Sequence, residues 1–358
     1  MITIIGAGPI GCYCGYLLSR AGKDVQIFEE HNSIGEPIQC TGLVTSSIKE
    51  IIKIKRKTIV NEIDKVKIFS KNDCLELKLK NKNMVLDRKK FDEYLAGLSS
   101  DVGVKIFLGH KFISNKERMV KVRFNKKQKT IKTDYLIGAD GPLSQVARLN
   151  NLFGRRKFIV GMQAVVNLKN ENYIEFYPSV GCFAWVVPEN EDICRIGVAS
   201  YSNVKRYFDR FLKLKKINNK KIIKRQGGLI PIYNPKLKIR KNNVYLVGDS
   251  ATQVKATTGG GIIPGLKAAK ILADSIICGK DYERECKRKL NINLLLHLKI
   301  RKIMDKLKEK DLDLLLKSCK KENIKRIIEM FDREYPKEFI LRIVLREPRF
   351  LYFLKFLF

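Results

Sequence analysis

The chain opens with an apolar strand that runs straight into a glycine-rich turn, and this combination constrains the fold more than any other feature. Residues 2–5 read Ile-Thr-Ile-Ile, and the turn Gly6-Ala-Gly8-Pro9-Ile-Gly11 follows before an apolar helix. Gly6 permits the tight turn, Gly8 lets a pyrophosphate approach the backbone, and Gly11 lets the helix pack closely on the strand. The helix directs its unpaired N–H groups and the positive end of its dipole at the phosphate. Gly6, Gly8, Pro9 and Gly11 are therefore candidate ligand contacts.

A second apolar run, residues 25–28, ends on two acids, Glu29 and Glu30. Glu29 stands where a carboxylate accepts hydrogen bonds from both ribose hydroxyls of an adenosine, and it would repel a 2'-phosphate. Glu30 is the neighbouring candidate for the same site. Strand, turn, helix, strand and acid together predict a Rossmann-like dinucleotide-binding domain, because a chance G-x-G-x-x-G would lack this context.

Size and cysteine content narrow the class of protein. A length of 358 residues with 45% hydrophobic residues predicts two or three interleaved folded domains. Nine cysteines without a C-x-x-C pair suit reduced thiols, so we expect neither a disulfide framework nor a metal site. No segment reaches the roughly 20 apolar residues of a membrane span. We therefore expect a cytoplasmic protein, with peripheral attachment to a membrane left open.

The charge is strongly positive, with 71 Lys and Arg against 37 Asp and Glu, a formal net charge of +34. Such a field attracts nucleic acid, acidic lipid headgroups or phosphorylated substrates. The densest basic block is residues 205–225. A lysine bias spread over solvent-facing helices explains the same excess, so the charge alone does not select a partner.

The periodicity predicts a second sheet and a helical end. Alternating residues at 65–69 and 75–79 indicate half-exposed antiparallel strands. Further strands are predicted at 104–108, 119–124, 130–133, 159–168, 173–176, 183–187 and 195–199, with buried parallel-type strands at 135–138 and 244–247. Residues 258–278 are expected to be helical, and the helical period continues from Tyr282 with breaks near Asn323 and Pro336.

Three more sites along the chain fit the ligand of the first turn. They are Gly138-Ala-Asp140-Gly141, then Gly248-Asp249 followed by Gly259-Gly260-Gly261-Ile262, and Leu86-Asp-Arg88-Lys-Lys-Phe-Asp92. This set resembles the flavoprotein group typified by para-hydroxybenzoate hydroxylase and implies FAD as the cofactor. By this resemblance Asp249 holds the ribityl chain, and Gly260 and Gly261 approach the isoalloxazine with Gly259 and Ile262 beside them. Arg88 reaches the flavin side, and Asp140 supports the site.

Within this group the sequence is similar to geranylgeranyl reductases, which saturate isoprenoid lipid chains. The loop Pro37-Ile-Gln-Cys40-Thr-Gly42-Leu matches that family's P-x-Q-C-x-G-L loop beside the flavin. The stretch 181–188 matches its G-x-Y-x-W-x-F-P strand, with Phe183 in place of Tyr and Val187 in place of Phe, and Ala256 replaces a proline. The resemblance places Cys40 and Gly42 at the flavin and implies an isoprenoid lipid substrate.

The resemblance also sets the expected architecture, an α/β fold with a Rossmann-like FAD-binding domain interleaved with a mostly antiparallel β-sheet substrate domain and a C-terminal helical region. Residues 1–64, 85–157 and 240–280 would form the discontinuous FAD-binding domain, residues 65–84 and 158–239 the substrate domain, and residues 281–358 the helical region.

The chemistry of an isolated alkene suggests roles for two groups of residues. Hydride transfer to such a bond needs a proton on the other carbon, and Cys40 is the reactive side chain in the flavin loop, either as proton donor or in ordering the isoprenoid. The alternative interpretation is that Cys40 is only a small buried packing residue. A polyprenyl chain needs an apolar tunnel, which Trp185 and Phe183 would line, although such aromatics also serve as ordinary core residues.

Several alternatives stay open at this stage. An FAD-dependent aromatic hydroxylase or halogenase would use the same scaffold. A flavin-bearing RNA-binding or RNA-modifying protein rests on the charge alone, because no RNA-binding motif accompanies it, so nucleic acid is not the favoured partner. No second G-x-G-x-x-G unit offers a nicotinamide site. The electron donor that reduces the flavin is therefore left open between a ferredoxin, another reduced carrier and NAD(P)H. The apolar segment 346–358 either packs on the domain or contacts an anionic membrane surface.

Overall fold

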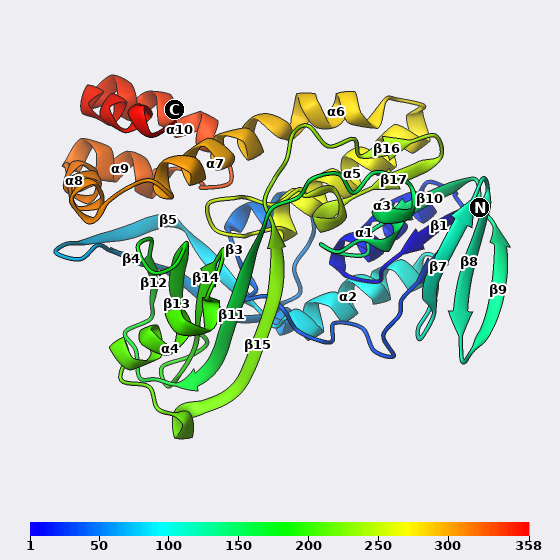
Figure 1. The fold of residues 1–358 in the computed structure, drawn as a ribbon, viewed down its shortest axis with the longest axis horizontal. Helices are drawn as coiled ribbons and strands as arrows, with labels where there is room; N and C mark the ends of the chain where they lie inside the picture. Colours follow the sequence, from blue (N-terminus) through cyan, green and yellow to red (C-terminus); the bar gives the residue numbers. More distant parts are fainter. Residues whose placement is uncertain (358) are drawn as a thin grey trace.

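A six-stranded sheet forms the base of the nucleotide-binding half (Figure 1). The computed structural model describes residues 1–357, so Phe358 at the end of the apolar segment lies outside the described residues. The strand order is β16-β17-β10-β1-β2-β6, parallel except for the edge strand β16. The strands are β1 (Ile2–Ile5), β2 (Val25–Phe28), β6 (Lys105–Phe107), β10 (Tyr135–Gly138), β16 (Arg240–Lys241) and β17 (Val244–Leu246). The Rossmann-like prediction is confirmed.

Alternating residues of these strands supply two separate cores. Ile4, Ile27 and Ile137 pack beneath three helices, α1 (Pro9–Arg20), α2 (Arg88–Asp101) and α5 (Ile262–Cys278). Phe28 and Leu136, one residue out of step, pack on the other face against α3 (Gln145–Leu149) and a three-stranded antiparallel sheet. That sheet consists of β7 (Lys111–Lys116), β8 (Met119–Phe124) and β9 (Lys127–Lys132), of which the sequence analysis missed β7.

The second half is an eight-stranded sheet with the order β15-β11-β14-β13-β12-β4-β5-β3. Its strands are β3 (Leu43–Val44), β4 (Ile59–Phe69), β5 (Cys74–Leu86), β11 (Phe158–Asn167), β12 (Tyr173–Tyr177), β13 (Phe183–Pro188), β14 (Ile193–Ser200) and β15 (Ile222–Pro231). Helix α4 (Val204–Leu214) covers one face, where Phe208 and Phe211 pack against Ala184 and Val186. Phe183 and Trp185 alternate with these residues and therefore lie on the opposite face.

The structure corrects several predicted boundaries. Strand β4 begins at Ile59 and not at Lys65, because its polar first half still pairs with β5. The basic block 205–225 covers almost all of α4 and the start of β15. Neither element was predicted, because exposed lysines and arginines obscure the apolar periodicity in both. Helix α5 begins at Ile262, because Gly259 adopts a φ of +68° that a helix does not allow.

The C-terminal quarter is helical, as predicted. It comprises α6 (Tyr282–Lys289), α7 (Asn291–Met304), α8 (Glu309–Cys319), α9 (Glu322–Met330), α10 (Pro336–Arg346) and the 3-10 helix η5 (Pro348–Leu357). Pro336 starts α10, since proline suits a first helical position. Figure 1 shows α8, α9 and α10 at the end of the molecule away from the three-stranded sheet. Among residues 1–357 no helix is long and apolar enough to cross a bilayer.

Four short 3-10 helices complete the chain: η1 (Ser46–Glu50), η2 (Arg56–Thr58), η3 (Asn219–Lys221) and η4 (Gly248–Ala251). Two of them bear on the site. Helix η4 follows β17 directly and carries Asp249, while η1 lies after the Cys40 loop and reaches the C-terminal helices through Glu50.

Candidate FAD-binding and active site

The first glycine turn is built by backbone crowding at the carboxyl edge of the six-stranded sheet. A Cβ on Gly6 would lie 2.5 Å from the carbonyl oxygen of Ala139, and one on Gly11 would lie 2.0 Å from the carbonyl oxygen of Gly6. No side chain fits at either position. Gly8 differs, because a Cβ there would meet nothing within 4 Å. The turn is therefore closed on the protein side and open at Gly8, where the N-terminus of α1 has no side-chain cap.

Glu29 lies at the end of β2 and faces the same turn. Its Oε2 accepts the Ala7 N–H at 2.8 Å, and its Oε1 accepts the His31 N–H at 3.0 Å with the His31 ring Nδ1 at 2.6 Å. The carboxylate is thus held at the turn, where the sequence analysis expected it. Glu30 is half exposed and pairs with Lys111 at 3.0 Å, so its side chain lies on the surface.

Asp140 organises the end of β10. Its carboxylate accepts the Ser144 hydroxyl at 2.6 Å and the Val146 N–H at 3.0 Å. Both donors lie at the start of α3, and burial raises the pKa of the Asp140 carboxyl. The carboxylate therefore connects the second motif to the helix that follows it.

The Cys40 loop lies beside Arg88. The Arg88 guanidinium binds Asp92 at 3.1 and 2.9 Å, and the Cys40 Sγ accepts the Gly42 N–H at 3.3 Å. Burial alone would lower the pKa of Arg88. The nearby Asp92 carboxylate and Cys40 thiol raise this pKa by more than burial lowers it, so the net shift is upward. A Cβ on Gly42 would lie 2.6 Å from the Leu86 carbonyl oxygen, which explains the glycine. Arg88 is a fixed cation beside the loop.

Asp249 is the one predicted carboxylate that the protein leaves free. Among residues 1–357 it has no hydrogen-bond or ion-pair partner. Its Oδ1 lies 2.8 Å from where a Cβ of Gly261 would be, so it faces the glycine turn before α5. Burial raises the pKa of Asp249 to about 6, and Arg88 opposes that shift. A half-buried carboxylate without a donor is placed to accept hydroxyl groups of a ligand.

The glycine turn before α5 joins the cofactor residues to the aromatic face of the large sheet. A Cβ on Gly259 would lie 3.0 Å from Ile230 and 3.6 Å from Phe183. The ring centroid of Phe183 is 5.7 Å from that of Phe176 and 5.7 Å from that of Trp185. The three rings form one apolar cluster beside the turn, together with Ala256 and Leu298. Phe183 is buried, whereas Phe176 and Trp185 are half buried.

Two polar residues that the sequence analysis missed fasten the Cys40 loop to this sheet. The buried Arg195 donates to the carbonyls of Thr41 and Leu86 and pairs with Glu189 at 2.5 Å. The buried Gln163 accepts the Thr41 hydroxyl at 2.7 Å and lies 3.3 Å from the Trp185 indole nitrogen. A lone arginine within the apolar strand 193–200 was the available signal for the first of them.

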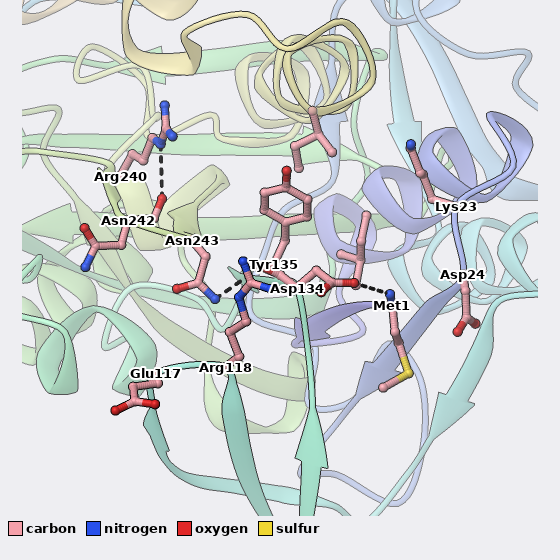
Figure 2. A pocket seen from close by; sticks show the side chains of 12 residues that line it. Met1, Lys23, Asp24, Glu117, Arg118, Asp134, Tyr135, Arg240, Asn242 and Asn243 are labelled. Carbon is pink, nitrogen blue, oxygen red and sulfur yellow. Dashed lines mark hydrogen bonds and ion pairs between the residues drawn. The ribbon is translucent and has the colours of Figure 1, made fainter.

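Two surface hollows differ in their relation to this site. A cleft of about 620 Å³ runs between residues 31–39 and the start of β15 and reaches Gln39 of the Cys40 loop. A second hollow of about 680 Å³ lies at the amino ends of the parallel strands (Figure 2). Several of its charges are paired, as in the 2.7 Å pair between the Met1 amino group and Asp134. Ligands of such sheets bind at the carboxyl edge, so only the first cleft adjoins the site.

Comparison with known proteins identifies the cofactor. Residues 1–203, more than half of the chain, match the FAD binding domain family. The chain belongs to this family. It is an FAD-dependent oxidoreductase, and the expectation of FAD is confirmed. The open side of Gly8 and the free carboxylate of Asp249 fit a cofactor with a pyrophosphate and a ribityl chain.

Relatives of this flavoprotein agree over nearly its whole length. Digeranylgeranylglycerophospholipid reductase of Methanocaldococcus jannaschii is 27% identical and the match covers 99% of this chain and 97% of the relative. Digeranylgeranylglycerophospholipid reductase 3 of Methanosphaera stadtmanae is 29% identical over 79% of each chain. These relatives confirm the resemblance to geranylgeranyl reductases.

Solved structures share the fold. A geranylgeranyl bacteriochlorophyll reductase-like protein of Thermoplasma acidophilum matches with a TM-score of 0.85 at 22% identity, covering 100% of this chain and 98% of that one. A flavin-dependent brominase matches with a TM-score of 0.74 at 14% identity over 98% of each chain. Reductase-like and halogenating flavoproteins thus share this fold. The fold alone does not distinguish the two activities, so the residues of the site must do so.

The unpartnered Asp249 predicts a pH dependence of FAD binding. The ionised carboxylate accepts hydroxyl hydrogen bonds better than the neutral acid, so affinity should be full above pH 7 and fall as the pH drops through about 6. Asp249→Asn should bind FAD roughly ten- to a hundredfold more weakly at pH 7.5 and should lose this step in affinity near pH 6. Flavin fluorescence titrations of apoprotein between pH 5 and 8 measure both effects. Persistence of the step in the variant would assign it to another group.

Proposed function

We propose that this flavoprotein saturates carbon–carbon double bonds in geranylgeranyl chains of archaeal-type membrane lipids. The observation that carries the proposal is the apolar cluster of Phe176, Phe183 and Trp185 beside the glycine turn before α5. Phe183 lies against the turn, and the half-buried Phe176 and Trp185 present an apolar surface next to it. An isoprenoid chain on that surface would be held by apolar contact alone, as a hydrocarbon requires. The names of these two relatives support the same substrate class.

The reaction adds a hydride to one alkene carbon and a proton to the other. Reduced FAD supplies the hydride when bound. Glu29 would hold the adenosine ribose, the open side of Gly8 would receive the pyrophosphate, and Asp249 would accept the ribityl hydroxyls. These contacts orient the cofactor and leave the chemistry to the space beside the Cys40 loop.

We assign proton delivery to Cys40. Its Sγ is half buried next to Arg88, in a loop that Arg195 and Thr41 fasten to the aromatic sheet. Holding the loop against Trp185 would keep water from the alkene and keep the thiol close to the chain. The proton lost by the thiol would return from solvent through the cleft that reaches Gln39.

The same cleft offers the reductant a route to the flavin loop. Its β15 wall carries Lys224 and Arg225, and its other wall carries Glu36 and His31. Glu36 is already paired with Lys89 at 2.8 Å. Within residues 1–357, Lys224 and Arg225 have no ion-pair partner, so the walls of the cleft carry a net positive charge. An anionic donor, either an acidic carrier protein or a phosphorylated nucleotide, suits such a wall.

The substrate class also gives a reason for an apolar surface at the far end of the C-terminal helices. Leu341 and Leu345 of α10 and Leu351 and Leu354 of η5 are exposed, Leu345 by 72%. Exposed basic residues lie among them, namely Lys337, Arg342, Arg346, Arg349 and Lys355, against the one exposed acid Glu338 in this stretch. Since Phe353 is buried, the segment both packs on the domain and presents this surface. We propose that it contacts an anionic membrane.

The proposed activity is tested with protein reduced by dithionite under anaerobic conditions and a geranylgeranyl-bearing phospholipid. We expect the lipid mass to rise by two hydrogens for each bond saturated, as measured by mass spectrometry. An aromatic hydroxylase or halogenase would instead couple substrate turnover to oxygen uptake, and oxygen uptake without lipid saturation would overturn the proposal.

Cys40→Ala should lower the rate of alkene saturation by at least a hundredfold while FAD binding is retained, because general acid catalysis contributes about 10²–10⁴. Cys40→Ser should keep part of the rate. Cys278→Ala is the matched control, since Cys278 is a free but exposed cysteine. Full activity in Cys40→Ala would leave Cys40 as a packing residue.

Membrane contact predicts co-sedimentation with vesicles that contain phosphatidylglycerol and weaker binding at high salt. Leu341→Ser with Leu345→Ser should weaken it roughly tenfold or more, because each leucine contributes on the order of 1 kcal/mol on partial burial. Leu214→Ser on α4 is the control, with the same 63% exposure as Leu341. Equal loss in the control, or no binding at low salt, would refute this surface.

A further inference from the structure

A short segment between α9 and α10 ties the C-terminal helices to the cofactor half. Its consecutive side chains each reach a different element. Arg333 donates to the Asn83 side chain of β5 at 2.6 Å, and Glu334 pairs with Lys255. The Tyr335 hydroxyl donates to Glu50 at 2.8 Å and accepts from Lys267 of α5 at 2.7 Å.

The ion pair at the centre of this segment is removed from water. The Lys255 side chain is 7% exposed and the Glu334 side chain 3%. Burial lowers the pKa of Lys255, while Glu334 opposes the shift. Around the pair lie Arg333 and His297, whose Nδ1 lies 2.8 Å from the Thr257 hydroxyl. Since burial lowers the pKa of His297 to about 3, the ring is neutral and adds no charge to the pair.

Lys255 belongs to the same turn that faces Asp249. Its backbone N–H donates to the Gly260 carbonyl at 3.1 Å, and its carbonyl accepts the Gly259 N–H at 2.9 Å. A Cβ on Gly260 would lie 2.8 Å from Lys255 Cε and 3.2 Å from its Nζ. The ammonium group therefore lies against Gly260, one of the glycines that the family resemblance places against the isoalloxazine.

We propose that the Lys255–Glu334 pair sets the reduction potential of the bound flavin. Reduced flavin carries more negative charge than oxidised flavin, so a cation under the turn favours the reduced form. Glu334 pairs with that cation and attenuates its effect in a medium of low dielectric constant. The C-terminal helices thereby contribute a charge to the redox centre. The inference rests on FAD binding at this turn and not on the lipid being the substrate.

The test is the midpoint potential of FAD in two single variants and their combination. Glu334→Gln leaves the cation uncompensated and should raise the preference for reduced over oxidised FAD by about tenfold, or about 30 mV for a two-electron couple. Lys255→Met should shift the potential in the opposite direction. Lys255→Met with Glu334→Gln should return it close to that of the unaltered protein, because both charges are gone.

Controls separate charge from structure. Glu347→Gln removes another buried carboxylate of the C-terminal helices, paired with Lys321 and Arg349, and should leave the potential unchanged. For a variant that holds FAD weakly, the ratio of the Kd values for oxidised and reduced FAD gives the preference for reduced FAD, and hence the shift in midpoint potential. Shifts of the same sign in both single variants, no shift in either, or loss of FAD from all variants including Lys255→Arg would overturn the proposal. The lipid assay plays no part in this measurement.

Discussion

The constraint on which the rest depends is the crowding of backbone at the carboxyl edge of the six-stranded sheet. Gly6 touches Ala139, Gly11 touches Gly6, and a Cβ on Gly265 would lie 2.6 Å from Ile10. Three distant parts of the chain thus meet at glycines, with the Ile10 side chain filling the contact between α1 and α5. This contact leaves the N-terminus of α1, Glu29 and Asp249 around one space, since each follows a strand of the same sheet.

The large sheet gains its function from its position against that edge. One face is an ordinary core under α4, but the opposite face carries the aromatic rings that meet the glycine turn. Arg195 and Gln163 are buried polar residues in otherwise apolar strands, and both bind the Cys40 loop. Their hydrogen bonds replace lost solvation and fix the loop at the edge of the eight-stranded sheet.

The C-terminal helices have two different faces. The outer face of α10 and η5 is apolar and basic, whereas the segment just before α10 reaches Lys255, in the glycine turn before α5, through Glu334. A buried ion pair adds little net stability compared with apolar packing, so its presence beside the proposed flavin site calls for another reason. An electrostatic effect on the flavin supplies one, and it uses the same desolvation that makes the pair costly.

The sequence by itself determined the elements whose signals are local. Spaced glycines, apolar strand runs and single acids at strand ends predicted the sheet, the turns and the positions of Glu29, Asp140 and Asp249, because these depend on backbone conformation and periodicity. Strands β7 and β15 and helix α4 escaped, since their exposed lysines mask the pattern. Only the tertiary structure decided which side chains pair across long separations. Lys255 with Glu334 and Arg195 with Thr41 have no local signature, because a long-range contact arises only when packing brings two segments together.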